Sequence, residues 1–331
     1  MESVFSSKIY IVIVTYNASQ YINQCLNSLL QSSVPCNVVI VDNGSTDNTV
    51  EIINEQYKDF KLIISEKNLG FGQGNNLGIQ YALADNADYI FLLNQDAFIL
   101  NNTLEELVKI SKKNPEYYIL SPLQLNGKGD SIDYSFSFYL LNESCKGLYD
   151  DFVLNKGKDL YETKFVNAAM WMMKRDCFLK VGDFDSIFFH YGEDNDYVSR
   201  VKYHGYKIGV CPKIIGYHDR AQKLFDYNTL SIKKRFKRRM VLYLINLMDI
   251  NDSYPSAVAK AFKRLIVENL RHLEKLEFVN VLIEIPAFFN VLLDSGKIIK
   301  NRNINKRRVP AETQVMYQDN VALLKSQVHN G

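Results

Sequence analysis

The sequence lacks the cysteine pairs and the long apolar segments that identify several common protein classes. Its five cysteines are odd in number and never form a Cys-x-x-Cys pair; they are Cys25, Cys36, Cys145, Cys177 and Cys211. This usage argues against a structural zinc site and indicates a reducing compartment. The apolar stretch 278–293 contains Glu284 and Pro286 and falls short of the ~18 uninterrupted apolar residues of a spanning helix. We therefore expect no transmembrane segment.

Two common phosphate-binding motifs are absent as well. A dinucleotide site of the Rossmann type needs glycines in the turn after the first strand, but that turn reads TYNAS. The glycines between Gly70 and Gly78 do not form Gly-x-Gly-x-x-Gly, and Gly-x-x-x-x-Gly-Lys-[Ser/Thr] does not occur. The sequence thus disfavours both an NAD site and a P-loop.

The composition is that of a globular protein with two unlike parts. Of the 331 residues, 47% are hydrophobic and 23% charged, which allows a sizeable core. Residues 1–221 carry 20 basic and 27 acidic residues, whereas 222–310 carry 18 and 8. The N-terminal stretch lacks a basic segment, so we expect a first strand there and no signal peptide. We predict an α/β domain over 1–225 and a basic helical region over 226–331.

Short β-branched runs alternate with helical patterns in the first part. This rhythm is typical of an α/β fold with a mostly parallel sheet. The predicted strands are 9–14, 38–41, 61–65 and 89–93, later joined by KIGV and IIGYH. Residues 122–160 have weak periodicity and are expected to form an excursion bordering a site. Helices are predicted over 194–204, 232–250 and 256–275.

Polar residues follow each of the first four predicted strands. Ligands of parallel α/β sheets bind beyond the carboxyl ends of the strands. Each cluster alone is equally typical of a turn or helix start, but their recurrence favours a site. A carboxylate such as Asp96, at the end of the apolar run YIFLL, suits Mg²⁺ or Mn²⁺ holding a diphosphate; the alternative is an acidic residue before the helix 101–112. The clusters contain Thr15 and Asn17, Asp42, Asn68 and Gly70, and Asn94 and Asp96.

Taken in order, the motifs of residues 8–220 resemble those of inverting family 2 glycosyltransferases with a GT-A nucleotide-sugar-binding fold. They are most similar to the bacterial rhamnosyltransferase-type branch that builds surface polysaccharide. The resemblance rests on IVIVTYN, VDNGSTDNT, NLGFGQGNNLGI, LLNQDA, VNAAMWMMKRDCFLKVGDFDSIFFHYGEDNDYVSRVKYHGYKI and the later His218.

The resemblance implies a role for each matching residue. The family commonly has Asp-x-Asp where this chain has Asn94-Gln95-Asp96, so one anionic ligand is missing, although Asn94 can still coordinate or reach the ribose. His218 is expected to complete the metal and diphosphate site. The nucleotide pocket is expected to be lined by Thr15, Asn17 and Asp42, closed by Asn68, Gly70 and Asn75, and to hold Mg²⁺ or Mn²⁺ at Asp96.

The YGEDNDY segment matches the family motif that supplies the catalytic base, which places this role on Asp194. An inverting transfer needs only one carboxylate to accept the acceptor proton, since the nucleotide diphosphate is a good leaving group. We interpret the flanking Glu193 and Asp196 as charges of a helix N-terminus. Trp171 could stack on an acceptor sugar or fill the core, and both readings stay open.

The implied protein is a cytoplasmic glycosyltransferase, peripheral on the inner face of the membrane. It would move a hexose or deoxyhexose from a nucleotide diphosphate sugar to a glycan or lipid-linked saccharide. A sugar-nucleotide nucleotidyltransferase is one alternative, although TYNAS lacks the glycine-rich basic loop that such enzymes need. A non-catalytic scaffold of glycan synthesis is the other.

Basic residues cluster around the apolar helical stretches of the C-terminal region. We expect them to dock on an anionic leaflet; a solvated helix face or an oligomer contact is the alternative, and nucleic-acid binding is disfavoured because the first part is acidic and lacks any such motif. The clusters are Lys233, Lys234, Arg235, Lys237, Arg238 and Arg239, and then Lys297, Lys300, Arg302, Lys306, Arg307 and Arg308.

Overall fold

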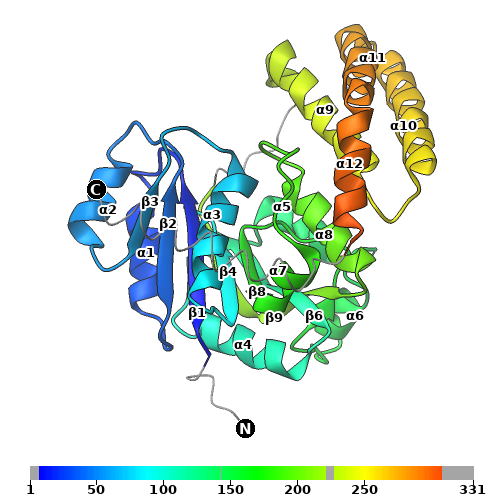
Figure 1. The fold of residues 1–331 in the computed structure, drawn as a ribbon. Coiled ribbons are helices and arrows are strands. Elements are labelled where there is room, and N and C mark those ends of the chain that lie inside the picture. Colours follow the sequence, from blue (N-terminus) through cyan, green and yellow to red (C-terminus); the bar gives the residue numbers. More distant parts are fainter. Residues whose placement is uncertain (1–6, 142, 221–226, 308–331) are drawn as a thin grey trace.

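The computed structural model describes residues 7–141, 143–220 and 227–307 (Figure 1). The first two ranges form an α/β body, and the third forms a group of helices that projects from it. The predicted boundary at 225/226 lies outside the described residues, as does Arg308.

One half of the sheet is parallel, as the β-branched runs predict. Its strand order is β3-β2-β1-β4, and all three pairings are parallel. The carboxyl ends of these strands therefore meet at one edge. The strands are β1 (Ile9–Thr15), β2 (Asn37–Asp42), β3 (Lys61–Ile64) and β4 (Tyr89–Leu93), connected by helices α1 (Ile22–Leu30), α2 (Thr49–Gln56) and α3 (Phe71–Ala84).

The other half of the sheet is mixed. Strand β8 pairs antiparallel with β4 and β6, while β6 runs parallel to β9, which β5 and β7 flank in antiparallel register. KIGV and IIGYH form one strand, because the β6–β9 pairing continues across a register shift after Pro122. The strands are β5 (Ala97–Ile99), β6 (Tyr117–Asn126), β7 (Tyr161–Glu162), β8 (Met170–Lys174) and β9 (Lys207–His218).

The predicted excursion begins later than expected, since β6 extends to Asn126. Helices α7 and α8 then return to cover the face of the sheet that α3 also covers. The remaining elements of this body are α4 (Thr103–Lys113), α5 (Tyr134–Ser137), a 3₁₀ turn (Phe138–Leu140), α6 (Leu148–Val153), α7 (Arg175–Val181) and α8 (Glu193–Tyr203).

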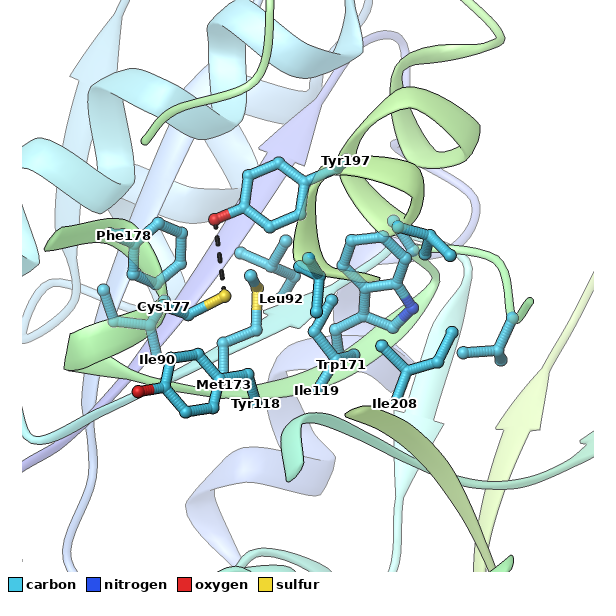
Figure 2. Close-up of a cluster of buried hydrophobic side chains, with 14 of the residues drawn as sticks. Ile90, Leu92, Tyr118, Ile119, Trp171, Met173, Cys177, Phe178, Tyr197 and Ile208 are labelled. Carbon is cyan, nitrogen blue, oxygen red and sulfur yellow. Dashed lines mark hydrogen bonds between the residues drawn. The ribbon is translucent and has the colours of Figure 1, made fainter. Parts of the chain in front are cut away.

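The sheet is buried on both faces. Figure 2 shows the cluster under α7 and α8, where Trp171 lies beside Tyr197 and the Tyr197 hydroxyl is 3.6 Å from Cys177 Sγ. Trp171 is 0% exposed and therefore belongs to the core, which excludes the stacking role on an acceptor sugar. The opposite face, including Ile11 and Phe91, packs under α1, α2 and α4.

Helix α3 lies unusually close to β1 because its inward positions are glycines. A methyl group on Gly78 would lie 2.4 Å from Val12 Cγ1, and one on Gly74 would lie 2.9 Å from Val14 Cγ1. Glycine lowers helix propensity, so the pattern gave no sign of this helix. Its glycines let the helix start reach the strand edge.

The C-terminal helices form a three-helix bundle with a fourth helix leading back to the α/β body (Figure 1). Arg302 on the fourth helix donates to the carbonyl oxygen of Leu247 at 2.6 Å, and Asn305 donates to Asp185 at 2.8 Å. The first contact holds this helix to the bundle, because Leu247 lies in the bundle itself, and the second fastens the helices to the α/β body. After a 3₁₀ turn (Tyr227–Thr229), the helices are α9 (Ile232–Met248), α10 (Tyr254–Glu274), α11 (Phe278–Leu293) and α12 (Ser295–Asn305).

Among the described residues, no single helix has the length and apolar character needed to cross a bilayer. Helices α11 and α12 meet that test only as a pair, and they are bent by 63° where they join.

The approach of α3 to β1 gives a stability test. Gly78→Ala should destabilise the protein by about 1–3 kcal/mol, because the added methyl group overpacks against the fully buried Val12. Gly296→Ala in α12 is the matched control, since no atom lies within 4 Å of its added methyl group; it should be neutral or stabilise by up to ~1 kcal/mol. Urea unfolding measures both, and equal stability of the two variants would contradict the packing.

Candidate active site

A cleft of about 380 Å³ opens at the carboxyl edge of the parallel strands. Its walls come from the turns after β1, β2, β3 and β4 and from the loop that precedes α8. Four of the predicted residues line it directly: Asn68, Gly70, Asn94 and Asp96. The structure thus brings together residues that are up to 28 positions apart in the sequence.

Thr15 and Asp42 lie behind the wall of the cleft and shape it. Asp42 is 1% exposed, and its carboxylate accepts hydrogen bonds from the Thr15 hydroxyl at 2.9 Å and the Ser45 amide at 2.9 Å. The Ser45 hydroxyl and the Gly44 amide donate as well, at 2.5 and 3.2 Å. These hydrogen bonds offset the cost of burying the carboxylate, and they fix the turn that follows β2.

The side chains of Asn17 and Asn75 also form hydrogen bonds with the backbone near the cleft. Asn17 has a positive φ of 50°, and its Oδ1 accepts from the Thr46 amide at 2.8 Å. The Asn75 side chain is buried and donates to the Phe71 carbonyl at 3.0 Å. Of the predicted nucleotide residues, these two and the Thr15–Asp42 pair therefore support the turns, while Asn68, Gly70 and Asn94 face the cleft.

Asn43, which the sequence analysis did not single out, clamps the loop after β3. Its Nδ2 donates to Asn68 Oδ1 and to the Gly70 carbonyl, both at 3.1 Å, and its Oδ1 accepts from the Leu69 amide at 2.8 Å. Gly70 has φ 84°, and a Cβ there would lie 1.8 Å from the Phe189 carbonyl oxygen. Only glycine allows this contact between the loop after β3 and the loop before α8.

Asp96 and His218 are brought together by sheet register. Ala97 pairs with His218 in the antiparallel β5–β9 ladder, which places His218 Nε2 3.3 Å from Asp96 Oδ1. The Asp96 side chain is 22% exposed and the His218 side chain 2%. Burial opposes ionisation of Asp96, but the hydrogen bond and charge of His218, with Arg220, keep its pKa below the ordinary value.

Asp133 and Arg220 form a layer behind this pair that the sequence analysis missed. Arg220 Nε donates to Asp133 Oδ2 at 2.9 Å, and the same oxygen is 4.0 Å from His218 Nδ1. Asp133 is fully buried at the start of α5. It lies in the weakly periodic segment, where the only signal was the Asp-x-x-Phe start of a short helix.

Gln95, in the middle of Asn94-Gln95-Asp96, has a structural role. Its Oε1 accepts from the Tyr16 amide at 2.7 Å and its Nε2 donates to the Tyr16 carbonyl at 3.3 Å. The side chain thereby ties the turn after β4 to the turn after β1. The backbone amide of Asn94 donates to the Ala169 carbonyl at 2.9 Å, and Asn94 also lines the cleft.

Asp194 lies in the first turn of α8, directly after the loop whose Phe189 and His190 line the cleft. Burial raises its pKa to about 6, although hydrogen bonds from the amide groups of Asn195, Asp194 and Ala168 oppose the shift. The charges of Asp194, Arg220 and Asp133 all act on the Tyr139 hydroxyl. Asp194 itself is not among the residues that line the cleft.

Glu193 and Asp196 lie in the first turn of α8, as predicted, but both side chains are buried and do more than carry charge there. Asp196 and Arg200 form an ion pair at 2.8 Å with both side chains 1% exposed. Glu193 is 5% exposed, and burial, then the Asp194 charge, raises its pKa to about 8. Both residues are buried because the segment 181–184 and helix α9 pack against α8, and the local sequence does not reveal that cover.

The residues at Asp96 fit one hard divalent cation. Asp96 and Asn94 line the cleft and could offer a carboxylate and an amide oxygen, and the buried His218 beside Asp96 could add a ring nitrogen; Mn²⁺ or Mg²⁺ accepts such a set when phosphates and water complete it. A second carboxylate and histidine cluster lies in the bundle, at Glu268, His272 and Glu284. There Arg239 Nε is 2.7 Å from Glu284, so its guanidinium takes the place a cation would need.

Comparison with known proteins agrees with this geometry. Residues 10–182 match the family model of glycosyl transferase family 2. A dTDP-rhamnosyl transferase, RfbF, from Shigella flexneri is 26% identical over 227 residues, covering 67% of this chain and 74% of that protein. An uncharacterised glycosyltransferase from Haemophilus influenzae is 36% identical over 110 residues, which cover 32% of this chain. The chain thus spans only 43% of the length of that relative.

Solved structures share the fold at low sequence identity. Staphylococcus aureus TarS in complex with UDP has a TM-score of 0.50 and 18% identity, over 76% of this chain and 68% of that one. GalNAc-T7 with UDP, GalNAc and Mn²⁺ has a TM-score of 0.52 and 17% identity, over 72% and 48%. These likenesses confirm the predicted GT-A fold, here with a mixed sheet and a helical C-terminal region. The family model covers more than half of the chain, and the protein belongs to glycosyl transferase family 2.

Proposed function

We propose that the protein is an inverting glycosyltransferase that moves a hexose or deoxyhexose from a nucleotide diphosphate sugar to a glycan. The observation that carries this proposal is the Asp96–His218 pair at the cleft, together with Asp194, whose pKa burial raises to about 6, in the helix that follows the cleft-lining loop. In this proposal the diphosphate leaves from the Asp96 side, and the acceptor hydroxyl attacks from the Asp194 side.

On the donor side, loop backbone and positively charged groups would bind the nucleotide. Asn68 and Gly70 present a loop that Asn43 fixes, and Arg220 adds positive charge near Asp96. A divalent cation, held by Asp96 with His218 and Asn94, would supply further positive charge for the diphosphate. UDP in TarS and Mn²⁺ in GalNAc-T7 support this assignment.

The acceptor side would supply the base. A carboxylate with a pKa near the working pH accepts a hydroxyl proton efficiently, and burial gives Asp194 this property. Glu193, with its pKa near 8, would stay protonated at neutral pH and leave the negative charge on Asp194. One base suffices because the diphosphate leaves without being protonated by an acid.

The proposed acceptor rests on the names of relatives alone. RfbF is a dTDP-rhamnosyl transferase, and a poly(ribitol-phosphate) β-glucosyltransferase from Bacillus spizizenii is 31% identical over 130 residues. These names support a growing polymer as acceptor. That this polymer is a surface polysaccharide or lipid-linked saccharide, and that the enzyme acts at the cytoplasmic face of the membrane, is our proposal. The ordered Asp96, His218 and Asp194 favour a working enzyme over a scaffold that only retains the fold.

Asp194→Asn should lower the turnover rate by about 10²–10⁴-fold while donor affinity changes little, because the change removes the base and preserves its volume. Radiolabelled sugar transfer and calorimetry measure the two quantities. Asp176→Asn is a matched control, since Asp176 is an exposed aspartate on α7 that pairs only with Lys180 among the described residues. A turnover rate for Asp194→Asn equal to that of the wild type would remove Asp194 from the mechanism.

The pH profile gives an independent prediction for the same residue. Because Asp194 must be deprotonated to accept a proton, turnover should rise as the pH passes through about 6 and level off above it. The residual activity of Asp194→Asn should lack this rise. A profile that is flat between pH 5 and 8 for the wild type would argue against a base with this pKa.

Asp96→Asn should weaken nucleoside diphosphate binding in Mn²⁺ and leave binding in EDTA nearly unchanged, because the carboxylate acts through the cation. Calorimetry with UDP, GDP and dTDP in both buffers measures this difference. If wild-type affinity is the same in EDTA and in Mn²⁺, the cation does not belong to donor binding.

A further inference from the structure

The outward side of α11 is almost entirely apolar. Eight residues of this helix are exposed, and seven of them are apolar; the eighth is Asn290. Leu282 is 73% exposed, Phe289 55% and Leu293 84%. The inward side carries the bundle contacts, including Ala287, Phe288 and Val291. A helix that is apolar all round is normally covered on all sides, so the outward side of α11 lacks its cover within the described residues.

Helix α10 continues this surface. Phe262 is half exposed, yet its ring lies 6.0 Å from the ring of Phe288 on α11, so this flank of α10 adjoins α11. Ile266, Leu270 and Leu273 follow Phe262 at helical spacing and are also exposed. We define the α10–α11 face by nine of the exposed apolar residues of the two helices: Phe262, Ile266, Leu270, Leu273, Phe278, Leu282, Ile285, Phe289 and Leu293. A contiguous apolar surface of this kind marks an interaction site.

Exposed basic residues frame the α10–α11 face. Lys263 follows Phe262 on α10, Lys275 stands at the turn between the two helices, and Lys297 and Lys300 extend from α12 just after Leu293. The basic cluster at the start of α9 contributes less than the sequence predicted. Its arginines contact the protein itself, because Arg235 donates to Asn280, Arg239 pairs with Glu284, and Arg238 lies over the ring of Tyr191.

The bundle also has a fixed relation to the active site. Gly192, at the end of the loop that lines the cleft, lies against Ile245 of α9, and Phe188 of the same loop belongs to the bundle core. Figure 1 shows the bundle projecting on the side of the sheet where the loop after β3 enters α3. A surface that the bundle touches would therefore lie close to the mouth of the cleft.

We propose that the α10–α11 face inserts into the headgroup region of an anionic lipid leaflet. Phenylalanine and leucine side chains bordered by lysines are the composition of helices that lie in a membrane interface, and the lysine frame complements acidic headgroups. A second copy of the chain is a weaker occupant, because an interface between two identical faces would bring their lysine frames together.

Co-sedimentation with lipid vesicles tests the proposal directly. The full chain should bind vesicles of phosphatidylcholine with phosphatidylglycerol, and weakly or not at all those of phosphatidylcholine alone. The pair Leu282→Gln and Phe289→Gln should reduce binding at least about tenfold, since both side chains are exposed and their loss leaves the bundle core intact. Lys263→Gln, Lys297→Gln and Lys300→Gln together should lower binding and flatten its dependence on salt.

Phe152→Gln and Val153→Gln form the matched control, because these α6 residues are 75% and 77% exposed but lie outside the α10–α11 face; they should bind as the wild type does. Asp194→Asn should also bind normally, which separates this proposal from the catalytic one. Equal binding to neutral vesicles, or binding unaffected by the Leu282 and Phe289 changes, would overturn the proposal. So would sedimentation equilibrium showing a dimer that these two changes dissociate while vesicles stay unbound.

Discussion

The buried carboxylate of Asp42 is the interaction on which the donor side of the site depends. It ends a strand that is buried on both faces, where an unpaired charge would be very costly. Thr15, Gly44 and Ser45 supply the donors that stabilise it, and this pairing fixes the turn after β2. Asn43, held in that turn, clamps the loop from Asn68 to Gly70. A single buried carboxylate thus orders the end of β1 and two loops that form the cleft.

The parts that sequence could predict are those set by local pattern. The β-branched runs gave the four parallel strands, because a strand buried on both faces is apolar throughout. The motifs nominated Asp96 and Asp194, and the structure places Asp96, but not Asp194, on the cleft wall. Helix α3 was missed because its glycines, which lower helix propensity, are required by the approach to Val12. The Asp133–Arg220 pair was missed because sheet register and a short helix bring together residues 87 positions apart.

Burial was the property that the sequence predicted least well. Glu193 and Asp196 have the composition of an exposed helix start, yet the tertiary cover of α8 makes one an acid with a raised pKa and the other a partner of Arg200. The arginines of the α9 cluster were expected to meet lipid, but Arg235 and Arg239 stabilise the bundle. In the opposite sense, the apolar stretch 278–293 has the composition of a core helix and leaves one side exposed. Charge and hydropathy patterns did not reveal which neighbour covers a helix.

The central claim is that a nucleoside diphosphate and a divalent cation share the cleft between the Asn68–Gly70 loop and Asp96, with Asp194 as the base. A crystal structure with Mn²⁺ and a nucleoside diphosphate, recorded at the manganese absorption edge, tests it most directly. The account predicts an anomalous peak at the Asp96 carboxylate next to His218, with the phosphates bound to it and Asp194 left free for the acceptor. A nucleotide bound elsewhere, or a manganese peak away from Asp96, would contradict the account.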